Sequence, residues 1–260
     1  MVEFIHILVT FFATSIGAII GIGGGVIIKP VLTFMAINDI SSITMLSTFT
    51  VLAMSFISTS KYLQAKVRFE GKITRNIVLG SILGGMLGGQ LFKIITDGFD
   101  KSVIQIIQSM IFIIMLSFVL YYVRNKNKFK RYKIDNSWFC FFLGVALGAN
   151  AAFLGVGGGP LNVAMFTIFF SFDMKKAAVH SLVIKMFSQV SKVLMIAATS
   201  GFASYDLKML VFMIPAAIAG GFIGASLARR VSEKVTTNLF VIVVSTTVLV
   251  NIVTVVMTVM

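Results

Sequence analysis

Three lysines lie inside apolar stretches of this 260-residue chain, where a charge is costly. Lys29, Lys185 and Lys192 have no carboxylate near them in sequence. A charge at the centre of a membrane costs at least ~2.5–3.5 kcal/mol on insertion scales, so such residues normally face a polar cavity. The alternative is snorkelling to the membrane surface, which fits Lys192 better than the other two. Cations without acids favour a small anion as ligand and argue against cation pumps and proton relays, which need intramembrane Asp or Glu.

Two of these lysines share a helix face with other polar residues. Lys185, Gln189 and Lys192 are spaced i, i+4 and i+7, which places them along one side of a helix. Ser181 and Ser188 lie on or near the same side. We therefore expect this face to line the cavity that receives the anion.

Two glycine clusters interrupt the apolar sequence at corresponding points. The first, "GIGGG", covers Gly21–Gly25, and the second, "GVGGG", covers Gly155–Gly159, 134 positions later. Each glycine costs a helix about 1 kcal/mol relative to alanine, so both clusters predict a helix break. Freed backbone at membrane depth is tolerated only where it is buried in protein or lines a cavity.

A short helix is expected to begin after each break, with its N-terminus inside the membrane. Pro160 suits a first helical position, and the free N–H groups of a helix N-terminus suit an anion. Lys29 follows the first break, whereas Val163 occupies the corresponding position after the second. The candidate anion-binding residues are Gly23, Gly24, Gly25, Lys29, Gly157, Gly158, Gly159, Asn162, Lys185, Gln189 and Lys192.

The elements that must position these residues are membrane helices. The chain is 58% hydrophobic and 12% charged, a balance that a bilayer solvates and a soluble domain of this size cannot cover. The runs near the ~20 residues needed to cross a membrane are Phe4–Ile22, Ile43–Leu63, Arg75–Ile95, Val103–Val123, Trp138–Leu154, Ala177–Thr199, Met209–Leu227 and Thr236–Val259. Val26–Ile37 and Pro160–Phe172 are only about 18–20 Å long as helices, so we expect re-entrant arms that turn back.

The net charge of +13 is concentrated in particular connections, which favours membrane topology over nucleic-acid binding as its explanation. Basic residues crowd the segments around 66–75, 124–133, 175–176 and 229–234, whereas the other connections are neutral or mildly acidic. The positive-inside rule makes the basic side cytoplasmic and both termini extracytoplasmic. Glu3 stands where a signal peptide needs a basic region, so the first segment is interpreted as retained.

The two halves of the chain are similar to each other. Besides the glycine clusters, a shared GGxxGxxL pattern follows Gly84 and Gly220, at an offset of 136. Simple close packing of helices is the alternative explanation for those glycines. The basic connections alternate in opposite order in the two halves, which predicts inverted-topology repeats. The predicted organisation is a first repeat over 1–123, a basic cytoplasmic linker over 124–135 and a second repeat over 136–260, in an all-α membrane protein.

The doubled GxGGG motif, with its second copy in "GANAAFLGVGGGPLNV", resembles the sulfite exporter TauE/SafE family, also called the TSUP transporters. The resemblance covers nearly the whole chain. It implies transport of sulfur-containing anions such as sulfite, sulfoacetate or other sulfonates across the plasma membrane. It also implies that the glycines of both clusters carry the helix breaks around the site.

These observations lead to the hypothesis of a secondary transporter that moves a small sulfur-containing anion by alternating access. The alternatives are an anion-conducting channel and a transporter of a different small anion. Na⁺ held by freed carbonyls, or H⁺, is a candidate co-transported ion. The expected partners are therefore the anion and the lipid bilayer, without nucleic acid.

An enzyme is not expected, and neither is a cofactor or a metal site. The lone Cys140 allows no intrachain disulfide and no CxxC motif. The apolar segments hold no paired acids, no His-rich metal site and no activated Ser or Cys, which an intramembrane hydrolase would need. His180 is expected at the membrane interface, and His6 at the interface or lining the cavity.

Overall fold

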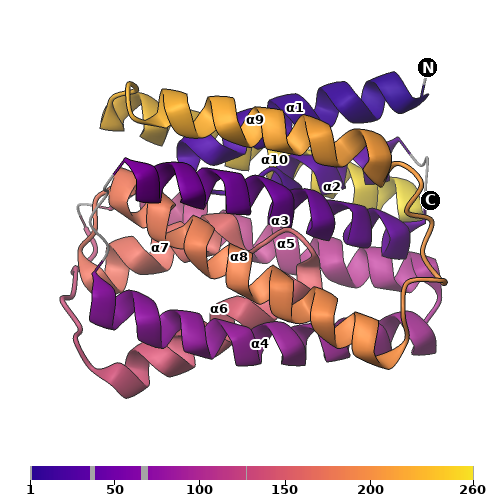
Figure 1. The fold of residues 1–260 in the computed structure, drawn as a ribbon, viewed down its shortest axis with the longest axis horizontal. Coiled ribbons are helices and arrows are strands. Elements are labelled where there is room, and N and C mark those ends of the chain that lie inside the picture. Colours follow the sequence, from indigo (N-terminus) through magenta and orange to yellow (C-terminus); the bar gives the residue numbers. More distant parts are fainter. Residues whose placement is uncertain (1, 36–38, 66–69, 127, 260) are drawn as a thin grey trace.

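The computed structural model describes residues 2–35, 39–65, 70–126 and 128–259, and this part of the chain forms α-helices without a β-strand (Figure 1). The helices are α1 (Val2–Ile20), α2 (Gly25–Phe34), α3 (Ile40–Gln64), α4 (Gly71–Gly98), α5 (Lys101–Arg124), α6 (Ser137–Leu154), α7 (Gly159–Phe170), α8 (Met174–Thr199), α9 (Leu210–Ala228) and α10 (Glu233–Val259). Eight of the described helices are long and apolar enough to cross a membrane, and α2 and α7 are the short ones. The prediction of eight long segments and two short arms is confirmed.

The two short helices differ slightly from their predicted ranges. The predicted end of the first arm, Ile37, lies outside the described residues. The second arm ends at Phe170 instead of Phe172, because Ser171 adopts a left-handed conformation with φ of 54° and stops the helix.

Glycines bring two pairs of long helices into backbone contact. Gly84 of α4 faces the backbone of Val145 in α6, and Gly88 faces that of Ala149, so the two helices run parallel. Gly220 and Gly224 of α9 face α1 in the same way, and Gly221 faces Met54 of α3. Close packing by small residues is the usual means of joining membrane helices. The packing explanation of these glycines is therefore confirmed.

Helices α3 and α8 run in opposite directions. The hydroxyl of Ser42, at the start of α3, accepts a 2.8 Å hydrogen bond from the N–H of Asp206, which follows α8. Glu70, which follows α3, bonds Lys176 at the start of α8. The helices that occupy the same place in the two halves of the sequence are therefore antiparallel neighbours.

Helix α7 turns back towards the end of the bundle at which α6 begins. The N–H of Tyr132 donates to the carbonyl of Ile168 at 2.8 Å, and the N–H of Ile134 donates to that of Phe169 at 3.0 Å. These bonds place the last turn of α7 beside the segment that precedes α6. The pair α6–α7 is thus a re-entrant hairpin, as predicted from the length of the second arm.

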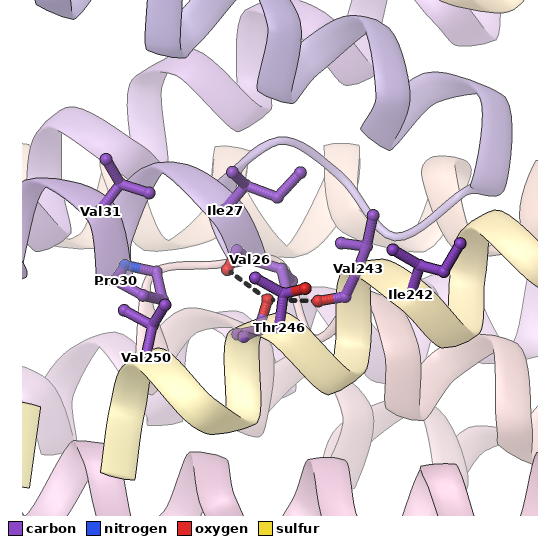
Figure 2. Close-up of a pocket in the computed structure, with 9 residues that line it drawn as sticks. Val26, Ile27, Pro30, Val31, Ile242, Val243, Thr246 and Val250 are labelled. Carbon is purple, nitrogen blue, oxygen red and sulfur yellow. Dashed lines mark hydrogen bonds between the residues drawn. The ribbon is translucent and has the colours of Figure 1, made fainter. Parts of the chain in front are cut away.

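Helix α2 turns back as well. It runs alongside α10 in the same direction, since Val26 contacts Thr247 through a 3.5 Å hydrogen bond and Pro30 shares a cavity with Val250 (Figure 2). Helix α10 ends at the end of the bundle where α1 begins (Figure 1). Helix α2 therefore returns towards the start of α1.

The two ends of the bundle differ in charge. We call the end where α4, α6, α8 and α10 begin the basic end, and the opposite one, where α1 begins and α10 ends, the terminal end (Figure 1). The basic end carries Lys72, Arg75, Arg124, Lys126, Lys128, Lys130, Arg131, Lys133, Lys175, Lys176, Arg229, Arg230 and Lys234. Its basic connections lie on one side of the bundle, as the sequence predicts.

Candidate functional site

Each glycine cluster begins with a glycine that ends the preceding helix. Gly21 has φ of 72° and Gly155 has φ of 67°, a left-handed conformation that glycine adopts without strain. A Cβ on Gly21 would also meet Ala178 of α8, and a Cβ on Gly155 would meet Thr44 of α3. Gly155 lies 134 positions after Gly21, and Ala178 lies 134 positions after Thr44, so the two contacts are equivalent in the two halves. The predicted breaks are confirmed, and each lies where a long helix of the other half packs against it.

The two breaks cross each other inside the bundle. The carbonyl of Ile22, in the first break, lies against Gly159, where a Cβ would overlap it. The Cα of Val156, in the second break, lies 2.9 Å from the position that a Cβ on Gly25 would take. All four residues are buried. The glycines are therefore needed for the breaks to touch, in addition to any role they have in stopping helices.

Helices α2 and α7 both start at this crossing, with unoccupied polar groups around them. Their flanking residues, Gly24 and Gly158, have no side chain to cap the first N–H groups of each helix. The buried hydroxyl of Ser47 lies 2.7 Å from the Cβ position of Gly25, and Oδ1 of Asn162 lies 3.2 Å from that of Gly158. Neither side chain has a hydrogen-bond partner among the described residues. An anion at this point would meet N–H, O–H and amide groups that folding leaves unpaired.

Lys185 lies between the two breaks. Its ammonium group donates a hydrogen bond to the carbonyl of Gly21, the residue that ends α1. Its side-chain carbons lie 3.0 Å from the Cβ position of Gly157, and Nζ lies 3.5 Å from that of Gly23. The absence of side chains at Gly23 and Gly157 therefore makes room for the lysine.

Lys29 reaches from α2 to the end of the other broken helix. Its Nζ donates to the carbonyl of Leu154, the last residue of α6, at 2.7 Å and to Oε1 of Gln108 at 2.6 Å. The amide nitrogen of Gln108 in turn donates to the carbonyl of Phe153 at 3.1 Å. A lysine at a helix C-terminus satisfies free carbonyls and is stabilised by the helix dipole.

Gln189 and Lys192 continue the polar face of α8 that the sequence predicts. The amide of Gln189 donates to the carbonyl of Ala151 in α6 at 3.1 Å. Nζ of Lys192 donates to Oγ1 of Thr48 at 3.2 Å and lies 4.3 Å from the ring centroid of Phe92. Lys192 is fully buried, so it does not snorkel to the surface. All the predicted site residues are buried, and Gln189 and Lys192 lie one and two turns beyond Lys185 along α8.

The positive charges of the site have no acidic counterpart. Lys29, Lys185 and Lys192 are buried, while eight of the nine acidic residues are exposed and Asp39 is partly exposed. Carbonyl, amide and hydroxyl oxygens accept hydrogen bonds but do not cancel a charge, and each ammonium has three donors. Protonated lysines here would be stabilised by a bound anion.

Sequence reasoning missed three partners of the lysines: Gln108, Thr48 and Phe92. Gln108 is an amide inside an apolar run, and polar residues at membrane depth usually face the protein interior, so that signal was available. Thr48 and Phe92 carry no comparable signal, because threonine and phenylalanine are common throughout the spans. His180 lies at the start of α8 but is buried, with its ring against Phe172.

Two cavities near α2 have different character. A cavity of about 170 Å³ between α2 and α10 is lined by aliphatic side chains and two threonines (Figure 2). Its lining lacks a charged group, so it does not suit an anion. A second cavity, lined by Lys29, Thr33 and Gln108 with neighbouring residues of α5 and α10, has a volume of only about 10 Å³. The space beside Lys29 is therefore about that of one water molecule.

Comparison with known proteins gives a family match. A protein-family model described as "Sulfite exporter TauE/SafE" matches residues 6–251. No curated protein and no solved structure matches the chain. Among the residues that the structure describes, no three His, Cys, Asp or Glu side chains gather into a group that could hold a metal ion.

Proposed function

The chain belongs to the sulfite exporter TauE/SafE family of membrane transporters, and on that premise we propose that it is a secondary transporter for a small sulfur-containing oxyanion. Sulfite, sulfoacetate and related sulfonates are the candidate substrates. The protein is a multi-pass membrane protein, with eight helices capable of spanning in the part of the chain that the structure describes. The family accounts for a small anionic substrate and a lipid bilayer as its partners.

The observation that carries the proposal is the group of three buried lysines, two at the ends of the broken helices and Lys192 further along α8, with no buried carboxylate to neutralise them. Their ammonium groups use only part of their donor capacity on Leu154, Gln108, Gly21 and Thr48. The helix N-termini beside them supply further N–H groups. A tetrahedral or pyramidal oxyanion, with three or more acceptor oxygens, can bond to several of these donors at once.

Alternating access would come from the two halves of the chain. Helix α1 of the first half packs on α9 of the second, and the equivalent helix of the second half, α6, packs on α4 of the first. Helices α3 and α8, which are also equivalent, lie antiparallel to each other. This arrangement supports inverted repeats that comprise residues 1–123 and 136–260, joined by the linker 124–135. In such transporters the substrate site lies at the repeat interface and the halves rock around it.

The orientation follows from charge. The basic end would face the cytoplasm by the positive-inside rule, so both termini would be extracytoplasmic in the plasma membrane. A reporter that is active only in the cytoplasm, fused after α10 and in a second variant inserted in the connection between α9 and α10, tests this. Activity from the first fusion and not from the second would reverse the assignment.

The function is tested by uptake into proteoliposomes of sulfite, thiosulfate, sulfate and sulfoacetate. We expect saturable uptake that is stimulated by the same anion on the opposite side. Lys29→Gln and Lys185→Gln should lower uptake on the order of tenfold or more, because a charge-assisted contact is lost. Lys208→Gln, at an exposed position at the terminal end, is the matched control. Uptake by both site variants equal to that of the wild type would refute the assignment of the site.

An anion channel is the competing proposal, since the same charges could line a continuous pore. Unitary currents in a planar bilayer would support the channel and count against the transporter. The narrow cavity at Lys29 favours a gated site over an open pore. If the substrate is not a sulfur oxyanion, a different anion should compete best in the uptake screen.

A further inference from the structure

We propose that a cavity at the basic end is the vestibule through which the anion reaches the crossed breaks, and that it binds small anions by itself. The proposal rests on the transporter function given above. The cavity has a volume of about 480 Å³ and opens between the ends of α1, α3 and α9 and the start of α8, at the left in Figure 1. We call it the basic-end cavity. Its lining residues are Ile19, Tyr62, Asp173, Lys175, Lys176, Ala178, Val179, His180, Ala228 and Arg229.

The walls of the basic-end cavity have an excess of positive charge. Lys175, Lys176 and Arg229 face a single lining carboxylate, Asp173. Asp173 accepts the N–H of Lys176 at 2.7 Å as the cap of α8, and the ammonium of Lys176 bonds Glu70 at 2.6 Å. Lys175 and Arg229 have no carboxylate partner among the described residues. A cleft lined by one sign of charge concentrates ions of the opposite sign and speeds their arrival.

The floor of the cavity is the first helix break. Ala178 lines the cavity and also lies against Gly21, so only one residue separates the cavity from the end of α1. Tyr62 lines it too, and its hydroxyl donates to the carbonyl of Ala18 in the last turn of α1 at 3.5 Å. An anion at the floor would therefore be next to the broken backbone.

A line of polar residues on α8 continues from this floor to the site. Ser181 and Lys185 follow Ala178 at i+3 and i+7, on the same face of the helix. The hydroxyl of Ser181 is buried and has no hydrogen-bond partner among the described residues. Lys185 then bonds the carbonyl of Gly21. The unpaired hydroxyl stands between the cavity and the first buried lysine, where a passing anion could use it.

The corresponding place at the terminal end differs in its polar groups. There Thr44 lies against Gly155, as Ala178 lies against Gly21, but its hydroxyl bonds the carbonyl of Ile40 at 2.7 Å. Ser42 beside it bonds the N–H of Asp206. The cavity at Lys29, on that side, holds about 10 Å³. Of these two cavities, the larger therefore lies at the basic end.

The test uses thiol labelling, because Cys140 is the chain's single cysteine and is buried. In a Cys140→Ala background, Val179→Cys and Ala228→Cys place a thiol on two walls of the cavity, from α8 and α9. Val183→Cys, one turn further along α8 and outside the lining, is the matched control. Val179 and Val183 are 7% and 8% exposed, so exposure alone does not favour the test position. A single gel-filtration peak and an unchanged melting temperature confirm folding of each variant.

We expect both wall cysteines to react with an anionic membrane-impermeant thiosulfonate supplied at the basic end, and Val183→Cys to react far more slowly. The anionic reagent should react faster than its cationic analogue on the order of tenfold, and Arg229→Gln with Lys175→Gln should remove that preference. Sulfoacetate or sulfate should slow the reaction. Sulfite is unsuitable as competitor because it attacks thiosulfonates.

The vestibule proposal would be overturned if labelling showed no preference for the anionic reagent, or if Val183→Cys and Val179→Cys were labelled equally. This outcome is separate from failure of the proposed function. If the charge preference and the protection by sulfoacetate are present while no anion is transported, the vestibule stands and the transporter proposal fails. Reaction only from the opposite side of the membrane would contradict the vestibule.

Discussion

Nζ of Lys29 in α2 donates a 2.7 Å hydrogen bond to the carbonyl of Leu154, the final residue of α6. The bond joins the short helix of the first half to the broken helix of the second half. Lys185 makes the reciprocal connection, from α8 in the second half to Gly21 at the end of α1. Each lysine thus holds the helix end of the other half.

Gln108→Glu should inactivate transport while the protein remains folded. Oε1 of Gln108 lies 2.6 Å from Nζ of Lys29, so a carboxylate there would form an ion pair and compete with the substrate. We expect anion affinity to fall on the order of tenfold or more, because a resident charge neutralises the lysine. Binding is measured by the shift in melting temperature on addition of sulfite or sulfoacetate.

The control for that substitution is Gln105→Glu, one turn earlier in α5. Gln105 bonds the hydroxyl of Thr258 at 2.8 Å, away from the lysines. The substitution Gln105→Glu makes the same chemical change at a partly buried position. A similar loss of anion binding in both variants would show that the added charge, and not its position beside Lys29, is responsible.

Gly159→Ala should destabilise the protein strongly for a single methyl group. Its Cβ would overlap the carbonyl of Ile22 in the crossed break, and neither backbone can move without separating the two breaks. Overpacking of this kind costs about 1–3 kcal/mol. Thermal unfolding in detergent measures the loss, with Gly71→Ala as control because nothing lies within 4 Å of a Cβ at Gly71. Equal melting temperatures for the two variants would mean that the breaks are not in contact.

Asn162→Leu should stabilise the fold and reduce anion binding. The side chain of Asn162 is fully buried, and neither of its polar atoms has a partner among the described residues. An unpaired buried polar group costs about 1–3 kcal/mol, which an apolar residue of similar size avoids. Asn251→Leu provides the comparison, since that buried amide donates to the carbonyl of Thr247 at 2.8 Å and should lose stability instead.

Both melting temperature and anion affinity are needed to judge Asn162→Leu. A gain in stability together with weaker binding of sulfoacetate supports a ligand-directed amide. A loss in stability would indicate that Asn162 has a structural partner, and it would remove this residue from the site.

The contact between Glu70 and Lys176 should stabilise the basic end in a pH-dependent way. The 2.6 Å hydrogen bond from Lys176, and its positive charge, lower the pKa of the Glu70 carboxyl below its ordinary value. The folded state therefore binds that proton less tightly than the unfolded state. The pair stabilises the fold above the ordinary carboxyl pKa of about 4.3, and the stabilisation is lost as the pH falls through the lowered folded-state pKa.

Glu70→Gln should accordingly lower the melting temperature at pH 7 and have less effect as the solution becomes more acidic. The change is expected to be small, because the side chain of Glu70 is 51% exposed and exposed ion pairs contribute little. Combining Glu70→Gln with Lys176→Met in a double-mutant cycle isolates the pair. Additive effects at pH 7 would show that the two side chains do not interact in solution.

The sequence predicts most of the fold because its signals are local. Apolar length identifies the eight long helices, and consecutive glycines identify the two breaks. The polar face of α8 follows from spacing, as its bonds from Lys185, Gln189 and Lys192 to other elements confirm. Local patterns of this kind depend on residues within two or three turns of each other.

The partners of the lysines could not be predicted in the same way. Lys29 is separated by 79 positions from Gln108 and by 125 from Leu154, and one of its two acceptors is a backbone carbonyl that any residue possesses. The crossing of the breaks is similarly non-local, since it depends on Ile22 facing Gly159. The sequence indicates which polar groups are buried in the membrane, and the packing of the two halves decides what they bind.

The two halves hold their lysines at positions that do not correspond. Val163 occupies the place of Lys29 in the second half, and Val51 occupies the place of Lys185 in the first. If the halves exchange conformations during transport, the substrate meets a different arrangement of charge in each state, so it should dissociate towards the two faces at different rates. This difference in rates changes the anion concentration at which transport saturates in each direction. It cannot by itself drive an anion against its electrochemical gradient. An inside-negative membrane potential can drive an anion outwards against its concentration gradient, because it favours outward movement of each negative charge by ~2.3 kcal/mol per 100 mV.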